Sequence, residues 1–432
     1  MRVRLRVRGA SDSLMSRLAA RVEERWPGVL DDGLDATAVA VAVDQMDEDA
    51  AWFAVATALG QMLATTRASR ELPVVGEREM SRRDLFGIFG LGRHDVPEAI
   101  PRVHADACQV ATGCRRCVDE CPTQALAIDD GGRLVLNASV CRRCGRCSAA
   151  CPVGALDHPP ASQSRVDAVF DLVRQTASAA PRIVVVFACG QAPRVVEPWV
   201  AWIDVAGVAA VGVRWLVQAA ASGAGAVIVW CADGGCPDRD VARQAVVTAT
   251  AAIEADGPAI RYVDGALTSD ALRRARDAGR SLVPVAVGSD SWEAFASSVA
   301  AVVRLDTPAR GLGFTGVRAS ASCTLCGACV RACPRQALRL NDAMALTVRA
   351  ASCSGCGACV GHCPEGALSL ADADGTVADA LRDTPIHQED LVRCRVCGQP
   401  VGPQAMVRRI AELLGSNVDD LCPACKAQSR LG

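Results

Sequence analysis

The chain has 432 residues, enough for roughly three domains or more, each with its own core. Half of the residues are apolar but only 3% are aromatic, a composition that favours α/β layers over a β-sandwich. A net charge of -2 argues against nucleic acid or an acidic membrane surface as an obligatory partner. No uninterrupted apolar stretch approaches the ~18 residues of a membrane span. We therefore expect a soluble protein built from several α/β and α+β domains.

Residues 1–75 predict a small α+β domain. Residues 1–9, MRVRLRVRG, alternate Arg with Val and Leu, as in an edge strand with a basic outer face. Helices are expected over residues 14–26 and 47–67, where long mixed segments contain no Pro. Nothing in this segment indicates a function.

Eight cysteines lie within residues 100–160, in two runs that each end in Cys-Pro. The second run, from Cys141 to Cys151, has the spacing C-x₂-C-x₂-C-x₃-C-P. The first run starts at Cys108 and has C-x₅-C in place of the first C-x₂-C. We interpret the longer interval as a lengthened loop that still delivers Cys108. Without Cys108, an iron-sulfur site formed by this run would lack one thiolate, and it would hold a three-iron cluster or use a water ligand.

The full spacing occurs twice more, in CTLCGACVRACP from Cys323 and CSGCGACVGHCP from Cys353. Two such runs resemble the bicluster ferredoxins of bacteria, over about residues 318–372 and again over residues 100–160. The resemblance implies two 4Fe-4S clusters in each module, with the last cysteine of each run serving the neighbouring cluster. The implied ligand sets are Cys108, Cys114, Cys117 and Cys151; Cys141, Cys144, Cys147 and Cys121; Cys323, Cys326, Cys329 and Cys363; and Cys353, Cys356, Cys359 and Cys333.

Residues 165–305 lie between the two modules and alternate runs rich in Val and Ile with helical stretches. This alternation predicts a parallel sheet with crossover helices. Cys189 and Cys231 end two of the runs, RIVVVFAC and GAVIVWC, and Cys236 follows shortly after. The carboxyl edge of such a sheet is where ligands bind.

The segment VIVWCADGGCPDRD resembles the iron-sulfur delta subunit of hydrogenases linked to heterodisulfide reductase. The resemblance implies a 2Fe-2S cluster at the central cysteines that passes electrons. That family has a further cysteine where this chain has WIDVAGVAAVG, so a fourth ligand would come from Asp204, Asp233 or a partner protein. The alternative is a binding domain that has lost its cluster.

Two C-x₂-C pairs lie within residues 390–430, with the amphipathic stretch PQAMVRRIAELLG between them. They resemble a small zinc ribbon, which implies a closed tetrahedral site of four thiolates with a structural or docking role. Rubredoxin-type iron is the competing interpretation, because thiolate ligands alone do not separate the two metals. The four expected ligands are Cys394, Cys397, Cys422 and Cys425.

Nearly all of the 23 cysteines have metal-type spacings rather than disulfide-type ones, which fits a reducing cytoplasm. The twin arginine of SRRDLF, residues 81–86, lies far from the N-terminus and has no adequate apolar segment behind it, so export is not expected.

The sequence has no G-K-[ST] loop, no convincing cofactor fingerprint and no nucleophile with an identifiable base, so no catalytic residue is assigned. This favours an electron-transfer subunit that relays single electrons through four 4Fe-4S clusters. Its expected partners are redox subunits: a flavoprotein, a hydrogenase, a heterodisulfide-reductase-like protein or a molybdenum enzyme. One alternative is a reductase with a small-molecule or 2Fe-2S site at the central cysteines. The other is an assembly or interaction protein.

Overall fold

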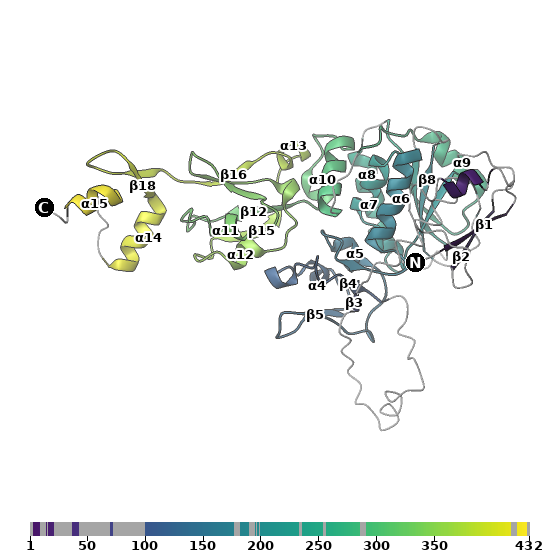
Figure 1. Cartoon of the computed structure of the whole chain (residues 1–432), viewed down its shortest axis with the longest axis horizontal. Helices are drawn as coiled ribbons and strands as arrows, with labels where there is room; N and C mark the ends of the chain where they lie inside the picture. Colours follow the sequence, from purple (N-terminus) through teal and green to yellow (C-terminus); the bar gives the residue numbers. More distant parts are fainter. Residues whose placement is uncertain are drawn as a thin grey trace, which may run out of the picture. The chain divides into compact units, whose positions relative to one another are not determined.

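The computed structural model describes residues 100–176, 182–189, 199–232, 236–253, 256–285, 291–415 and 421–429, with short stretches before residue 72 and single residues at 195 and 197 (Figure 1). The chain divides into two compact units. The first contains Met1–Cys108 and Arg116–Arg304, and the second contains Gln109–Arg115 and Leu305–Gly432. Among the described residues, no helix has the length and apolar character needed to cross a membrane.

A four-stranded parallel sheet forms the centre of the first unit, as the sequence predicts. Its strands lie in the order β11 (Ala259–Asp264), β10 (Ala226–Cys231), β8 (Val184–Cys189) and β9 (Val200–Asp204). Every residue of β8 and β10 is buried, as expected for strands of a parallel sheet that is covered on both faces. The chain passes from β8 to β9 and then crosses to β10 on the other side of β8. The strand order therefore reverses between β8 and β10.

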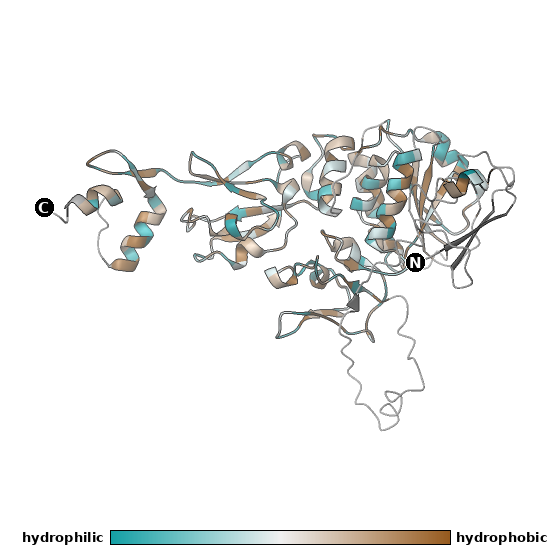
Figure 2. Cartoon of the chain, in the orientation of Figure 1, coloured by the Kyte–Doolittle hydropathy of each residue, from teal (hydrophilic) through white to brown (hydrophobic). Residues whose placement is uncertain are grey.

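Helices cover this sheet, and the hydrophobic residues gather in its strands (Figure 2). Helix α7 packs against α8 and α10, while α9 contacts β8, β10 and β11. All of α7 except Val213 is buried. The helices are α6 (Gln163–Thr176), α7 (Val213–Ala221), α8 (Arg239–Ala252), α9 (Ser269–Ala278) and α10 (Ser291–Val302).

The two ferredoxin-type modules share one layout, in which each cysteine run contains a one-turn helix and is followed by a short strand. The first module contains β4 (Arg102–Val103), the 3₁₀-helix η1 (Val110–Thr112), α4 (Arg116–Asp119), β5 (Leu126–Ile128), β6 (Leu134–Leu136), α5 (Arg146–Ala150) and β7 (Leu156–Asp157). The second contains β12 (Thr315–Ala319), α11 (Ala328–Ala332), β13 (Leu338–Leu340), β14 (Ala345–Val348), α12 (Ala358–Gly361) and β15 (Leu368–Asp372).

The corresponding strands of the two modules pair alike. Antiparallel pairs join β4 with β7 and β12 with β15 at the outer ends of each module. A second antiparallel pair follows the first run of each, β5 with β6 and β13 with β14. The repeated pairing places the two runs of each module against each other.

The second unit continues beyond its module into a hairpin and two helices. The elements are α13 (Val377–Ala380), β16 (Thr384–Gln388), β17 (Leu391–Arg393), β18 (Pro400–Pro403), α14 (Gln404–Leu414) and α15 (Pro423–Ser429). Strand β16 extends the β13-β14 pair, and α14 packs on the β17-β18 hairpin. The segment Gln109–Arg115 is also part of this unit, where the Ser354 hydroxyl donates to Gln109 Oε1 at 3.0 Å.

At the N-terminus, β1 (Val3–Arg8) forms at the expected place and pairs in parallel with β2 (Thr37–Ala42). Residues 16–20 are helical, within the first expected helix. The second expected helix, over residues 47–67, lies outside the described residues.

Candidate metal centres

All four cysteine runs end in the same turn, Cys-Pro-x-x-Ala. In each turn the alanine N-H donates to the cysteine sulfur, with nitrogen-sulfur distances of 3.2, 3.2, 3.3 and 3.3 Å for Ala125, Ala155, Ala337 and Ala367. The residue before the alanine has positive φ in each: 53° at Gln124, 61° at Gly154, 51° at Gln336 and 57° at Gly366. Such N-H donors stabilise thiolate and tune a cluster bound to it.

The glycine inside a run has an equally specific role. In three runs, the second cysteine is followed by a glycine with positive φ: 80° at Gly145, 72° at Gly327 and 78° at Gly357. Each of these glycines lies directly before the short helix of its run. Left-handed backbone favours glycine because a side chain there meets the following carbonyl. The run that starts at Cys108 has Arg115 at this position.

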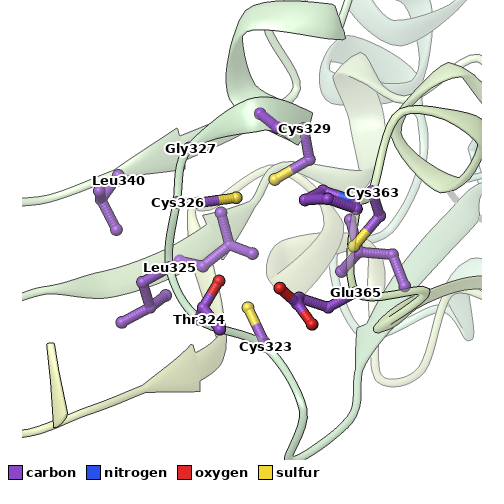
Figure 3. A pocket seen from close by; sticks show the side chains of 13 residues that line it. Cys323, Thr324, Leu325, Cys326, Gly327, Cys329, Leu340, Cys363 and Glu365 are labelled. Atoms are coloured by element: carbon purple, nitrogen blue, oxygen red, sulfur yellow. The ribbon is translucent and has the colours of Figure 1, made fainter. Parts of the chain in front are cut away.

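Four cysteines of the second module line one cavity of about 370 Å³, including its opening to solvent (Figure 3). They are Cys323, Cys326, Cys329 and Cys363. Their sulfur atoms point into the space between the two runs, with Leu325 and Glu365 beside them (Figure 3). Apart from this glutamate and Thr324, the walls are apolar or sulfur-bearing.

The other four cysteines of the module line a second cavity of about 320 Å³. They are Cys353, Cys356, Cys359 and Cys333. Each cavity thus takes three cysteines from one run and the last cysteine of the other. This is the grouping that the crossed ligand sets require, and the ligation of iron itself stays a prediction.

Burial disfavours the thiolate form of the cysteines that line the two cavities. Burial raises the pKa of Cys359 to about 12, and the neighbouring Cys353 and Cys333 add to the rise. Burial raises the pKa of Cys329 to about 11, with a further contribution from Cys323. Without metal these thiols are protonated at neutral pH, so cluster binding must displace their protons.

In the first module, one predicted set is close together within the first unit. Burial raises the pKa of Cys147, and Cys117, Cys144, Cys141 and Cys121 each raise it further. The pKa of Cys144 is also raised, first by burial, and Cys121 contributes. Cys121, from the other run, is thus within electrostatic reach of the thiols whose cluster it is expected to bind.

The other predicted set of this module is divided between the two units. Cys108, Cys117 and Cys151 belong to the first unit and pack against one apolar cluster. Cys114 belongs to the segment Gln109–Arg115 of the second unit. This run differs from the other three in the lengthened loop between Cys108 and Cys114. The role of Cys108 as a ligand stays a prediction.

Two segments of the chain, residues 103–155 and 322–367, match the family model of the 4Fe-4S dicluster domain. The chain carries two 4Fe-4S dicluster domains. Both matches contain the turns and the short helices described above, and they support a role in iron-sulfur electron transfer. A search of curated proteins found no match.

Sequence reasoning missed two charged groups beside these domains. Arg214 on α7 is buried, and its Nη1 donates to the carbonyls of Cys151 at 2.5 Å and Pro152 at 3.0 Å. Arg409 on α14 pairs with Glu365 at 3.1 Å. An arginine within the apolar stretch GVRWLVQAAAS was the available signal for the first. No feature of the sequence indicated the ion pair between Arg409 and Glu365.

The structure brings the three central cysteines together at the carboxyl edge of the parallel sheet. Cys189 and Cys231 end β8 and β10 in register, and Cys236 lies just before α8. A hydrogen bond with Cys236 raises the pKa of Cys189, and burial adds to the rise. The same hydrogen bond, with N-H donors at Asp238 and Val208, lowers the pKa of Cys236 to about 6.

Of the two aspartates proposed as a fourth ligand, only Asp204 lies within the described residues. Asp204 ends β9, and its carboxylate pairs with Arg165 at 3.8 Å. Asp233 lies outside the described residues. An all-thiolate 2Fe-2S cluster needs four thiols, so a cluster at these three cysteines requires a ligand of another kind or from a partner and stays a prediction.

The four C-terminal cysteines form a tight group. Their four sulfur atoms all lie within 4.8 Å of one another: those of Cys394, Cys397, Cys422 and Cys425. In the described part of the chain, no other set of three or more possible metal ligands is this close. Four sulfurs on one zinc would be about 3.8 Å apart, given Zn-S bonds of about 2.3 Å. N-H donors at Cys422, Cys397 and Val396 help to lower the pKa of Cys394 to about 6. The arrangement suits a metal ion, while its identity stays a prediction.

Proposed function

We propose that this protein is an electron-transfer subunit of a cytoplasmic oxidoreductase complex, with four 4Fe-4S clusters held by its sixteen ferredoxin-type cysteines. The observation that carries the proposal is the repeated Cys-Pro-x-x-Ala turn. Four copies aim an N-H at a cysteine sulfur, and in the second module they close two cysteine-lined cavities. An iron-sulfur cluster exchanges one electron with little rearrangement, and N-H donors set its potential.

In this proposal the partners are redox subunits, one that supplies electrons and one that accepts them. Candidates are a flavoprotein, a hydrogenase, a heterodisulfide-reductase-like protein or a molybdenum enzyme. The C-terminal thiols bind zinc as a small ribbon that stabilises the end of the chain or docks a partner, because a closed four-thiolate site has no open position for chemistry.

Metal analysis tests the proposal directly. Protein purified without oxygen is expected to contain about sixteen cluster irons and matching sulfide, together with about one zinc. A 2Fe-2S cluster in the central domain would raise the iron content to about eighteen. About eight irons in fully reconstituted protein would mean that one of the two modules holds no clusters.

A further inference from the structure

Three cysteines of the central domain have no place in the four ferredoxin-type clusters. Cys189 and Cys231 end strands β8 and β10, between which the strand order of the sheet reverses. In open parallel sheets this point, at the carboxyl ends of the strands, is where ligands bind. Cys236 reaches the same point from the segment that leads into α8. The three cysteines therefore lie where a ligand-binding site of this sheet is expected.

The three thiols differ in access to solvent. Cys236 is half-buried, whereas Cys189 and Cys231 are 6% and 1% exposed. Cys236 lies near the N-terminus of a 14-residue helix and receives N-H donors from Val208 and Asp238, which stabilise a thiolate. Cys189 is more deeply buried, and its thiol is close enough to that of Cys236 for each to shift the pKa of the other. A half-buried thiol beside a more deeply buried one at the same sheet edge is the arrangement of a nucleophile and a resolving cysteine.

The ferredoxin loop of the first module touches this site within the same unit. A Cβ added at Gly207 would lie 3.0 Å from the carbonyl oxygen of Cys144, so the two backbones are in close contact. The next residue, Val208, donates its N-H to the sulfur of Cys236. Arg142, beside Cys144 in sequence, pairs with Asp238 at 3.1 Å. A short path thus joins an expected cluster ligand to the half-buried thiol.

We infer that Cys189 and Cys236 form a redox-active dithiol that reduces a disulfide substrate with electrons from the adjacent cluster of the first module. The inference rests on the proposed electron-transfer function. It assigns the central domain a chemical role that needs no fourth metal ligand.

The reaction balances as two thiol-disulfide exchanges and two single-electron steps. The Cys236 thiolate attacks one sulfur of the substrate R-S-S-R′, and R′S⁻ leaves and takes a proton. Cys189 then attacks the Cys236 sulfur and gives its own proton to the departing RS⁻, which forms the Cys189-Cys236 disulfide and RSH. Two electrons then pass singly from the cluster and cleave this bond, with uptake of the proton that restores the Cys189 thiol. The sum is R-S-S-R′ + 2e⁻ + 2H⁺ → RSH + R′SH.

The first test uses the full-length holoprotein with its clusters reduced and excess reductant removed. Added 5,5′-dithiobis(2-nitrobenzoate) should be reduced with two cluster electrons consumed per disulfide. Cys189→Ser and Cys236→Ser should each slow this at least tenfold while they leave the reduced-cluster spectrum unchanged. If both variants keep the wild-type rate, the inference is wrong.

Peptide mapping after an acid quench provides a readout that does not depend on rate. The protein treated with the same disulfide should contain a Cys189-Cys236 linkage, and Cys231→Ser should retain it. A cluster at this site would instead appear as about two additional irons that are lost in all three variants, and that result would overturn the inference.

The contact between Gly207 and Cys144 is tested by Gly207→Val, whose side chain would press on the backbone of Cys144. Electron transfer from the clusters to the Cys189-Cys236 disulfide should slow at least threefold, while dithiothreitol should reduce that disulfide at the wild-type rate. Gly212→Ala is the control, because its Cβ would meet Ala149 at an ordinary 3.5 Å. Equal rates in wild type and Gly207→Val would refute the path. If the clusters accept no electrons, the proposed electron-transfer function is wrong. If the clusters can be reduced but no Cys189-Cys236 disulfide forms, only the inference of a redox-active dithiol is wrong.

Discussion

Glutamine occupies the left-handed position of two of the four Cys-Pro-x-x-Ala turns, where the other two have glycine. Left-handed backbone costs a residue with a side chain about 1–2 kcal/mol, and the greater unfolded-state freedom of glycine offsets part of that. Gln124→Gly and Gln336→Gly should therefore each stabilise the holoprotein by roughly 0.5 kcal/mol. Anaerobic thermal unfolding followed by circular dichroism measures this. Gly366→Ala, the reverse change, should destabilise, and a loss of stability in Gln336→Gly would contradict the strain argument.

The crossed cavities make a second prediction for single residues. Cys333→Ser should remove the same paramagnetic resonance signal of the reduced clusters as Cys353→Ser, although the two positions are twenty residues apart in sequence. Cys363→Ser should remove the same signal as Cys323→Ser, because a serine hydroxyl is a poor iron ligand at neutral pH. If Cys333→Ser matches Cys323→Ser instead, each run holds its own cluster.

At the residue scale, the cysteine spacing pointed to bicluster ferredoxins, and that resemblance implied which cysteines line each cavity of the second module. It could not predict Arg214 or the pair of Glu365 and Arg409. Both depend on elements that meet only in three dimensions, and neither residue belongs to a recognisable motif.

Helix α14 places a charge pair beside one of the cysteine-lined cavities, where Glu365 lines the cavity and Arg409 of the helix pairs with it at 3.1 Å. A negative charge near a cluster disfavours the added electron. Glu365→Gln should raise the midpoint potential of the cluster at Cys323, Cys326, Cys329 and Cys363, and Arg409→Gln should lower it, each by on the order of a few tens of millivolts given partial solvent screening. Potentiometric titration with resonance detection measures both, and shifts of the same sign would exclude this mechanism.

The C-terminal hairpin and its two helices should bind their metal independently of the clusters. The double variant Cys394→Ser with Cys397→Ser should lose the zinc but keep the visible cluster spectrum largely intact, because the four thiols form a group of their own. Zinc analysis and absorption spectra of the same sample test this. A folded double variant without cluster absorbance would show that the hairpin is not a separate site.

At the scale of elements, the parallel sheet was predictable because continuous Val and Ile runs are long enough to identify buried strands. The helices of the ferredoxin-type modules were not, since α4, α5, α11 and α12 have only four or five residues and no apolar periodicity. The loop around each cysteine run, rather than helix propensity, determines where they form.

For the whole molecule, the sequence predicted five segments in order but not how they combine. Most of the first ferredoxin-type module shares one unit with the central domain, and glycines lie where the two are in close contact. A Cβ at Gly145 would lie 2.5 Å from that of Ala210, and one at Gly207 would press on Cys144. Close backbone contact of this kind leaves no periodic signal in a sequence, whereas metal-ligand spacing does.

The two cavities of the second module each close with a cysteine from the opposite run. During synthesis, a chain that has emerged only as far as Cys333 therefore has no complete site. One set of four cysteines is complete when Cys359 has emerged, and the other follows at Cys363. In the proposed function, neither cluster can therefore be completed before most of the second run has emerged. Proteolytic loss of either run would then empty both sites, so a partly degraded module could not persist as a carrier with half its capacity.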